Sequence, residues 1–247
     1  MDWRYPQYIA HRCGGALTPE NTLAGLRLAA RLGFRAVEFD ATLSADGVPI
    51  LIHDETLERT TSGSGKVADT SLAQLSRLDA GARHHRAFAG EPLPTLEQAL
   101  ALCHSLNLSA NIEIKPATAH EDETGAIVAG LAKAAAHRWP KATLLLSSFS
   151  ETALMAAGKV AAELPRALLV EDIPTDWRTR LQQLGCVAIH CAARRLRSEQ
   201  AAEVAAAGIP LACYTVNRPE EAARLLAAGV AAIFTDRLDL FDPSTHQ

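Results

Sequence analysis

The sequence predicts an α/β fold: a (β/α)8 TIM barrel with a small insertion after the second strand. Eight short apolar runs recur along the chain, and each except the last is followed by a helical pattern. Alternating strands and helices indicate a parallel sheet, and eight such units close into a barrel. The length suits a single domain spanning 1–247. An open doubly wound sheet is the alternative, which the lack of a glycine-rich nucleotide-binding motif disfavours.

The first strand is expected at 8–11, and a helix over 21–32 follows it. Thr18 is expected to cap that helix and Pro19 to take its first position, because these residue types are favoured there. Gly33 is expected to end it.

The second strand, 35–40, alternates strictly between apolar Val37 and Phe39 and acidic Glu38 and Asp40. Residues two apart share one face of a strand, so the two carboxylates lie side by side. Carboxylates on a buried strand are costly unless a positive group lies with them. A divalent cation is the obvious candidate for that group.

Residues 55–94 interrupt the regular alternation. They follow a further extended segment at 48–54 and contain a loop-like run at 60–65 and a possible short helix at 71–78. We interpret 55–94 as an insertion on the barrel, because it is too short and polar to form a core of its own.

From residue 95 the alternation of helix and strand becomes regular. The apolar spacing and the turn residues give the remaining elements in order. Helices are expected at 95–106, 122–137, 151–162, 175–184, 198–207 and 219–228, and strands at 110–115, 143–147, 166–170, 187–190, 210–215 and 231–235.

Composition excludes several classes of partner. The net charge of −4 provides no basic surface for nucleic acid or an anionic membrane. No apolar run reaches the roughly 18 residues of a membrane span, and the N-terminus lacks the apolar region of a signal peptide. The five scattered cysteines indicate reduced thiols. A cytoplasmic location is therefore expected, whereas the oligomeric state is not predicted.

Catalytic groups of such barrels lie at the C-terminal ends of the strands, where this chain places a coherent polar set. Glu38, Asp40 and Glu113 form an oxygen-rich cluster from neighbouring strands. Oxygen ligands are those that Mg²⁺ or Ca²⁺ prefers, whereas zinc favours more nitrogen or sulfur. The sequence therefore predicts a site for a hard divalent cation.

Four further side chains at the same strand ends suit phosphoester chemistry. Arg12 and Lys115 are positive groups for an anionic substrate. His11 and His53 are imidazoles available as general acid and base near neutral pH. A metal, a phosphate clamp and two histidines together suggest cleavage of a phosphoryl ester.

Simpler structural interpretations exist for several of these residues. Lys115 can neutralise Glu113 instead of binding phosphate. His190, at the end of the sixth barrel strand, is ambiguous between packing and substrate contact. For Asp236 we favour a role as the N-cap of a final turn.

With these residues identified, the sequence resembles the glycerophosphodiester phosphodiesterase family, nearest to its short cytosolic bacterial members. The resemblance runs from about residue 7 to 240. It rests on His11-Arg12 with Pro19-Glu20-Asn21-Thr22, Glu38-Phe39-Asp40, Asp46-Gly47-Val48-Pro49 through His53-Asp54, Arg59-Thr60-Thr61, Asn111-Ile112-Glu113-Ile114-Lys115, Tyr214-Thr215-Val216-Asn217 and Thr235-Asp236.

The resemblance implies hydrolysis of a glycerophosphodiester to sn-glycerol 3-phosphate and an alcohol. The insertion would face the substrate. The implied roles are acid and base for His11 and His53, ligands of Mg²⁺ or Ca²⁺ for Glu38, Asp40 and Glu113, phosphate binding for Arg12 and Lys115, and lining of the glycerol pocket for Tyr214.

Cys13 departs from the family pattern, which has glycine after the histidine and arginine. Its side chain could crowd the phosphate, or its backbone could need a shape that glycine adopts more easily. A non-catalytic phosphoester-binding barrel, in which Cys13 has disabled the site, is therefore one alternative. A separate alternative keeps the enzyme but changes the substrate: a lysophospholipase D-like activity with an acyl groove near 55–94.

Overall fold

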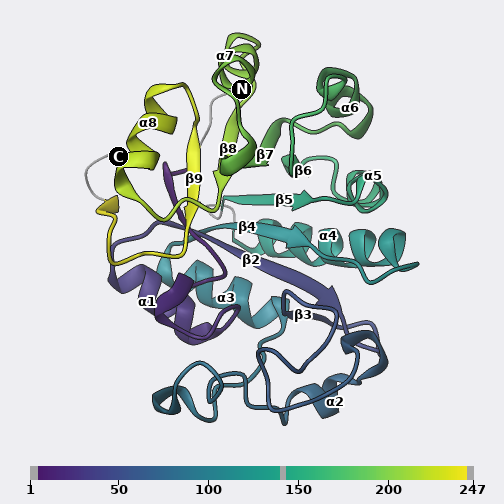
Figure 1. Ribbon diagram of the computed structural model, residues 1–247. Helices are drawn as coiled ribbons and strands as arrows, with labels where there is room; N and C mark the ends of the chain where they lie inside the picture. The colour runs from purple at the N-terminus through teal and green to yellow at the C-terminus, as the bar shows by residue number, and fades with distance from the viewer. Residues whose placement is uncertain (1–4, 140–142, 244–247) are drawn as a thin grey trace.

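The computed structural model describes residues 5–139 and 143–243. Its parallel strands close into a barrel because β1 (Tyr8–Ala10) pairs with both β2 (Ala36–Leu43) and β9 (Ala232–Thr235) (Figure 1). This closure confirms the predicted (β/α)8 architecture. The other parallel strands are β4 (Ser109–Ile114), β5 (Leu144–Ser148), β6 (Arg166–Val170), β7 (Ala188–Ala192) and β8 (Leu211–Tyr214).

Helices follow the strands and cover the outside of the barrel (Figure 1). The faces of β2 and β4 that carry Val37, Phe39, Ile112 and Ile114 belong to the large apolar core that these helices complete. These helices are α1 (Leu23–Arg31), α3 (Leu96–Leu106), α4 (Glu121–Arg138), α5 (Glu151–Val160), α6 (Trp177–Leu184), α7 (Ser198–Ala206) and α8 (Pro219–Ala227), whereas the short α2 (Leu72–Leu75) lies in the insertion.

The start of the first helix differs from the prediction. Thr22, not Thr18, is the N-cap of α1, and its Oγ1 accepts a hydrogen bond from the Gly25 N–H. Asn21 has a positive φ of 56°, which a helix does not allow. In this conformation the Asn21 side chain contacts Asp40 of β2. Pro19 and Asn21 therefore belong to a loop beside β2 and not to the helix.

The insertion begins with β3 (Pro49–Leu51), which pairs antiparallel with the end of β2. The segment after it forms a small apolar cluster of its own around Leu57, Leu75 and Leu93, together with Ile50. Residues 55–94 thus take part in a small core, which they share with Ile50 and Ile52 from outside these bounds. Short β3 contributes apolar residues to the cluster, which the composition of 55–94 alone does not reveal.

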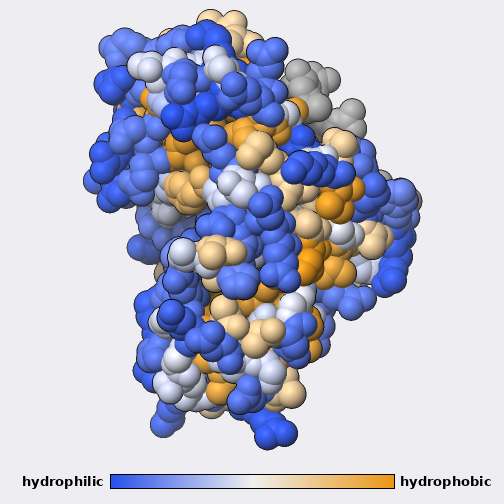
Figure 2. Space-filling view, turned by 90° about the vertical axis from the view of Figure 1, so that its right-hand side faces the viewer, coloured by the Kyte–Doolittle hydropathy of each residue, from blue (hydrophilic) through white to orange (hydrophobic). Residues whose placement is uncertain are grey.

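The C-terminal ends of the strands form the mouth of the barrel. Figure 2 presents the side towards which β2, β4 and β5 point in Figure 1, and hydrophilic residues cover much of it. Within the described residues, no helix combines the length and apolar character needed to cross a bilayer.

Candidate active site

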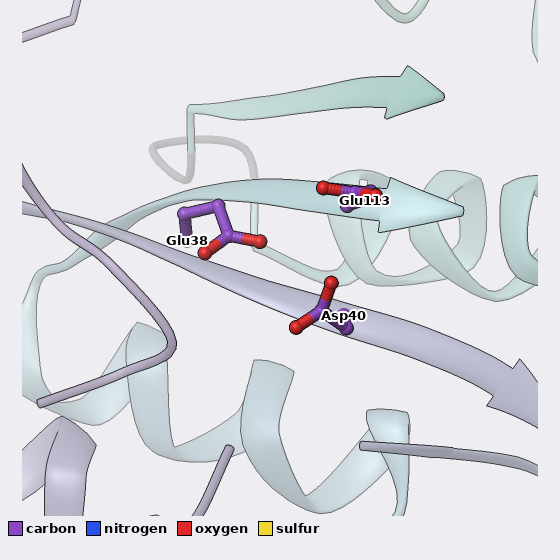
Figure 3. Close-up of side chains that lie close together, drawn as sticks. All are labelled: Glu38, Asp40 and Glu113. Atoms are coloured by element: carbon purple, nitrogen blue, oxygen red, sulfur yellow. The ribbon is translucent and has the colours of Figure 1, made fainter. Parts of the chain in front are cut away.

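Three carboxylates converge at the mouth of the barrel (Figure 3). Glu38 and Asp40 come from the inner face of β2, and Glu113 comes from β4, where it pairs with Asp40 in the strand register. One oxygen from each lies within 4.8 Å of the others. The structure thus brings together all three acids that the sequence predicted as ligands.

The electrostatics of this cluster suit a cation. Burial raises the pKa of Glu38 well above its ordinary value, and the charges of Asp40 and Glu113 raise it further. The Glu38 Oε1 atom is buried without a hydrogen-bond partner, as is the Oδ1 atom of neighbouring Asn111. Buried oxygens that lack donors carry a desolvation cost which a divalent cation would remove. The donor set therefore fits Mg²⁺ or Ca²⁺.

Asp40 is held in place by Asn21. The Asn21 Nδ2 donates to Asp40 Oδ2 at 2.8 Å, and the Asp40 backbone N–H donates to Asn21 Oδ1 at 3.0 Å. Both residues are buried. This pair fixes the orientation of one carboxylate before any ligand binds, a supporting role that the sequence did not single out for Asn21.

His11 has a carboxylate partner from the far end of the chain. Its Nδ1 lies 2.7 Å from Asp236 Oδ1, and its Nε2 lies 3.8 Å from Glu38 Oε2. Asn217 donates to the other Asp236 oxygen at 3.2 Å. The preference for Asp236 as a helix N-cap is therefore wrong, because its side chain contacts the histidine instead.

His53 has the same kind of partner. Its Nδ1 lies 2.7 Å from Asp54 Oδ1, and its Nε2 lies 3.3 Å from Lys115 Nζ. Burial lowers the pKa of His53, against the opposing effects of the Asp40 charge and of the hydrogen bond with Asp54. A neutral imidazole with Nδ1 bound to a carboxylate leaves its Nε2 atom available to exchange a proton.

The two predicted phosphate-binding side chains flank the acids. Arg12 Nε lies 3.8 Å from Asp40 Oδ2, and the Arg12 backbone N–H donates to Glu38 Oε2 at 2.9 Å. Lys115 Nζ lies 3.4 Å from Glu113 Oε1. Lys115 thus contacts Glu113, as its simpler interpretation anticipated.

A pocket of about 230 Å³ opens beside these groups. His190 and Tyr214 line it along with Phe149. The Tyr214 hydroxyl donates to the Val170 carbonyl at 2.8 Å, so the tyrosine is anchored to β6. Burial lowers the pKa of His190 to about 3, which keeps this imidazole neutral.

Cys13 does not crowd this site. Its side chain is fully buried in the core between barrel and helices, where Gly25 of α1 leaves room: a Cβ on Gly25 would lie 2.8 Å from that of Cys13. Its φ of 74° lies in the left-handed region, so the position does have the backbone shape that glycine adopts more easily. Burial raises the pKa of the thiol, which therefore stays protonated.

Comparisons with known proteins agree with this arrangement. The model of the glycerophosphoryl diester phosphodiesterase family matches residues 11–240. A glycerophosphodiester phosphodiesterase from Caldanaerobacter subterraneus subsp. tengcongensis is 34% identical over 238 residues, which is 96% of this chain and 94% of the relative.

Solved structures agree as well. A phosphodiesterase from Oleispira antarctica, in complex with the product sn-glycerol-3-phosphate, superposes with a TM-score of 0.89 at 35% identity, over 94% of both chains. A glycerophosphodiester phosphodiesterase from Agrobacterium tumefaciens has a TM-score of 0.77 at 28% identity, over 96% of this chain and 99% of that one.

The fold, the acidic cluster and these relatives define the class of the protein: it is a phosphodiesterase built on a (β/α)8 barrel. Within that class, the chain belongs to the glycerophosphoryl diester phosphodiesterase family.

The acidic cluster leads to a pH-dependent stability of the metal-free protein. Burial, and then the charge of Asp40, raises the pKa of Glu113 from 4.5 to about 7. The folded state therefore binds this proton more tightly than the unfolded state, so the corresponding stability is present below pH 4.5 and is lost as the pH rises towards 7. The loss amounts to about 3 kcal/mol at most, or several degrees in Tm.

Calorimetry in the presence of a chelator at pH 5 and pH 7.5 checks this prediction. Glu113→Gln is the control, because it removes the titrating group, and the Tm difference between it and wild type should widen at the higher pH. Added Ca²⁺ or Mg²⁺ should raise the wild-type Tm mainly at pH 7.5, where protons no longer compete for the carboxylates. A Tm difference that is independent of pH contradicts the expectation.

Proposed function

We propose that this protein hydrolyses glycerophosphodiesters to sn-glycerol 3-phosphate and an alcohol, with Mg²⁺ or Ca²⁺ as cofactor. One observation carries the proposal: a cluster of three carboxylates is flanked by two histidines, each hydrogen-bonded through Nδ1 to its own carboxylate. The bound product of the Oleispira antarctica structure supports the same substrate class.

The roles of the side chains follow from their positions. Glu38, Asp40 and Glu113 would hold the cation, which when bound supplies a Lewis acid for the phosphoryl group. Arg12 and Lys115 would bind the phosphate oxygens; the guanidinium can do so through two parallel hydrogen bonds. Phosphate binding would also draw Lys115 away from Glu113.

The histidines would move the protons. One Nε2 would take a proton from the hydroxyl that attacks phosphorus, and the other would give a proton to the departing alcohol oxygen; water supplies the oxygen that the product phosphate gains overall. Asp236 and Asp54 keep the Nδ1 side of each ring occupied and so fix which nitrogen reacts. Tyr214 would line the glycerol end of the pocket.

The test is release of sn-glycerol 3-phosphate from glycerophosphocholine and from diesters with other head groups, with and without chelator. Product that disappears with chelator and returns with Mg²⁺ or Ca²⁺ is expected. Absence of product from every head group with either cation would refute the proposal. The cytoplasmic location stays a prediction.

The lysophospholipase D-like alternative loses its main support in the structure. It requires an apolar groove on the insertion, yet Leu57, Leu75 and Leu93 are buried in the insertion's own cluster. Leu72 and Leu78 pack against the same cluster. The three buried side chains are therefore not available to an acyl chain.

The non-catalytic alternative supposes that Cys13 disables the site, so it predicts that Cys13→Gly gains activity. The proposed function predicts no such gain. Glycine relieves the left-handed backbone by about 1 kcal/mol but gives up a buried thiol of similar worth. We expect Tm to stay within a few degrees and kcat/KM within about twofold of wild type. Enzyme assay and calorimetry check this, and an inactive wild type that gains activity on substitution would establish the alternative.

A further inference from the structure

We propose that Arg59, on the insertion, is a positioning residue that orients both the acid–base histidine His53 and the phosphate-binding Arg12. The inference rests on the proposed function and adds to it a residue outside the predicted site. Its basis is a continuous chain of ion pairs that joins the two ends of the active site through the Arg59 guanidinium.

The Arg59 guanidinium bridges two carboxylates. Its Nη1 and Nη2 donate to the two oxygens of Glu20 at 2.7 and 2.8 Å. On its other side, Nη2 donates to Asp54 Oδ1 at 3.0 Å and Nε donates to Asp54 Oδ2. Both contacts are therefore bidentate. Two parallel hydrogen bonds fix the orientation of each carboxylate in addition to attracting it.

Each bridged carboxylate contacts one member of the site. Asp54 Oδ1 lies 2.7 Å from His53 Nδ1. Glu20 Oε1 accepts a hydrogen bond from Arg12 Nη1 at 3.1 Å. Charges of opposite sign thus alternate from Asp54 to Arg12. The groups follow in the order His53 imidazole, Asp54 carboxylate, Arg59 guanidinium, Glu20 carboxylate and Arg12 guanidinium.

Removal of the central guanidinium changes both ends. Asp54 loses the hydrogen bonds from Arg59 that most strongly lower its pKa, and its orientation beside His53 is released. Glu20 keeps Arg12 as its one cationic partner among the described side chains, which draws that guanidinium away from the substrate phosphate. Misorientation of His53 lowers kcat, and withdrawal of Arg12 raises KM.

The backbone around Arg59 is anchored independently of these ion pairs. Leu57 and Thr61 on either side are buried, and the Thr61 hydroxyl donates to the Leu57 carbonyl at 2.7 Å. Isolated surface ion pairs contribute little, but this guanidinium is held at both ends by two carboxylates that are themselves only 20% and 28% exposed. The insertion therefore presents Arg59 to the site in a defined position.

Arg59→Ala tests the inference with glycerophosphocholine and saturating cation. We expect kcat to fall and KM to rise, so that kcat/KM drops about 10- to 100-fold, as for loss of hydrogen bonds between charged groups. Guanidinium at concentrations far below those that unfold proteins should restore part of the rate, whereas urea, of similar shape but uncharged, should not. Arg59→Lys should lie in between, because an ammonium cannot make both bidentate contacts.

Two single substitutions separate the effects on His53 and on Arg12, the two ends of the series of ion pairs. Asp54→Asn should lower mainly kcat, because it acts on His53, and Glu20→Gln should change mainly KM, because it acts on Arg12. Arg77→Ala is the matched control: Arg77 is exposed on the same insertion, after α2, and takes no part in the ion pairs of Arg59, Glu20, Asp54 and Arg12. It should keep the wild-type kcat and KM and give no response to guanidinium.

Wild-type kcat and KM in Arg59→Ala would overturn the inference. So would a loss of activity that follows a fall in Tm and does not respond to guanidinium. A wild-type protein that releases no sn-glycerol 3-phosphate would instead refute the proposed function, so the two failures are distinguishable.

Discussion

Asp40→Asn is expected to lower kcat/KM by about 1000-fold or more and, at the same time, to raise the Tm of the metal-free protein. Asn keeps the shape of the side chain but removes one of the three negative charges that would hold the cation. Asp40 is 1% exposed, so no water replaces the lost charge interaction. Without a cation, Glu38 and Glu113 no longer face the negative charge of Asp40, so the repulsion within the cluster falls and the fold gains stability.

The two effects together distinguish loss of a metal-ligating side chain from misfolding of the Asp40→Asn variant. Calorimetric titration with Ca²⁺ or Mg²⁺ should show weakened binding, and thermal unfolding with chelator should show the gain in Tm. Glu123→Gln, an exposed acid on α4, is the control and should retain both activity and cation binding. Wild-type activity in Asp40→Asn, or unchanged cation affinity, contradicts the proposed ligand set.

His11→Ala and His53→Ala are each expected to lower kcat by about 100- to 10,000-fold, the usual contribution of a positioned acid or base. Both rings lie at the mouth with Nδ1 on a carboxylate, so each substitution removes the reactive Nε2. Substitution of the partners, Asp236→Asn and Asp54→Asn, should cost less, because the imidazole itself remains.

The leaving group distinguishes the acid from the base. In a glycerophosphodiester of a nitrophenol, the nitrophenolate leaves without being protonated. The variant that lacks the acid should therefore recover much of its rate on that substrate, while the variant that lacks the base should not. His137→Ala, on an exposed face of α4, should behave as wild type. Near-wild-type rates in both active-site variants would show that the histidines do not carry the proton transfers.

Local sequence patterns were sufficient to predict the barrel and the cluster of three acids at its mouth. The period-2 alternation of β2 and β4 separates Val37 and Phe39 from Glu38 and Asp40, and parallel pairing then brings Glu113 beside Asp40. Both predictions need only the strand period and the rule that strand ends meet at one rim. The three acids of the cluster are therefore predictable from the sequence alone.

Contacts between distant segments could not be predicted in this way. Asp236 contacts His11 across a sequence separation of 225 residues, and no local pattern distinguishes it from a helix cap. Thr18 and Pro19 form a plausible helix start, but the chain uses the following Asn21 to hold Asp40. In each case a contact in three dimensions overrides the local preference.

The closure of the barrel by β1 has a consequence for synthesis of the protein. Strand β1 is completed early on the ribosome, but its partner β9 and the carboxylate of Asp236 emerge among the last residues of the barrel. Pairing of such distant segments is the slowest kind to form. A nascent chain can therefore fold its middle βα units while His11 still lacks its partner, and hydrolytic competence would arise only when the final strand joins the first.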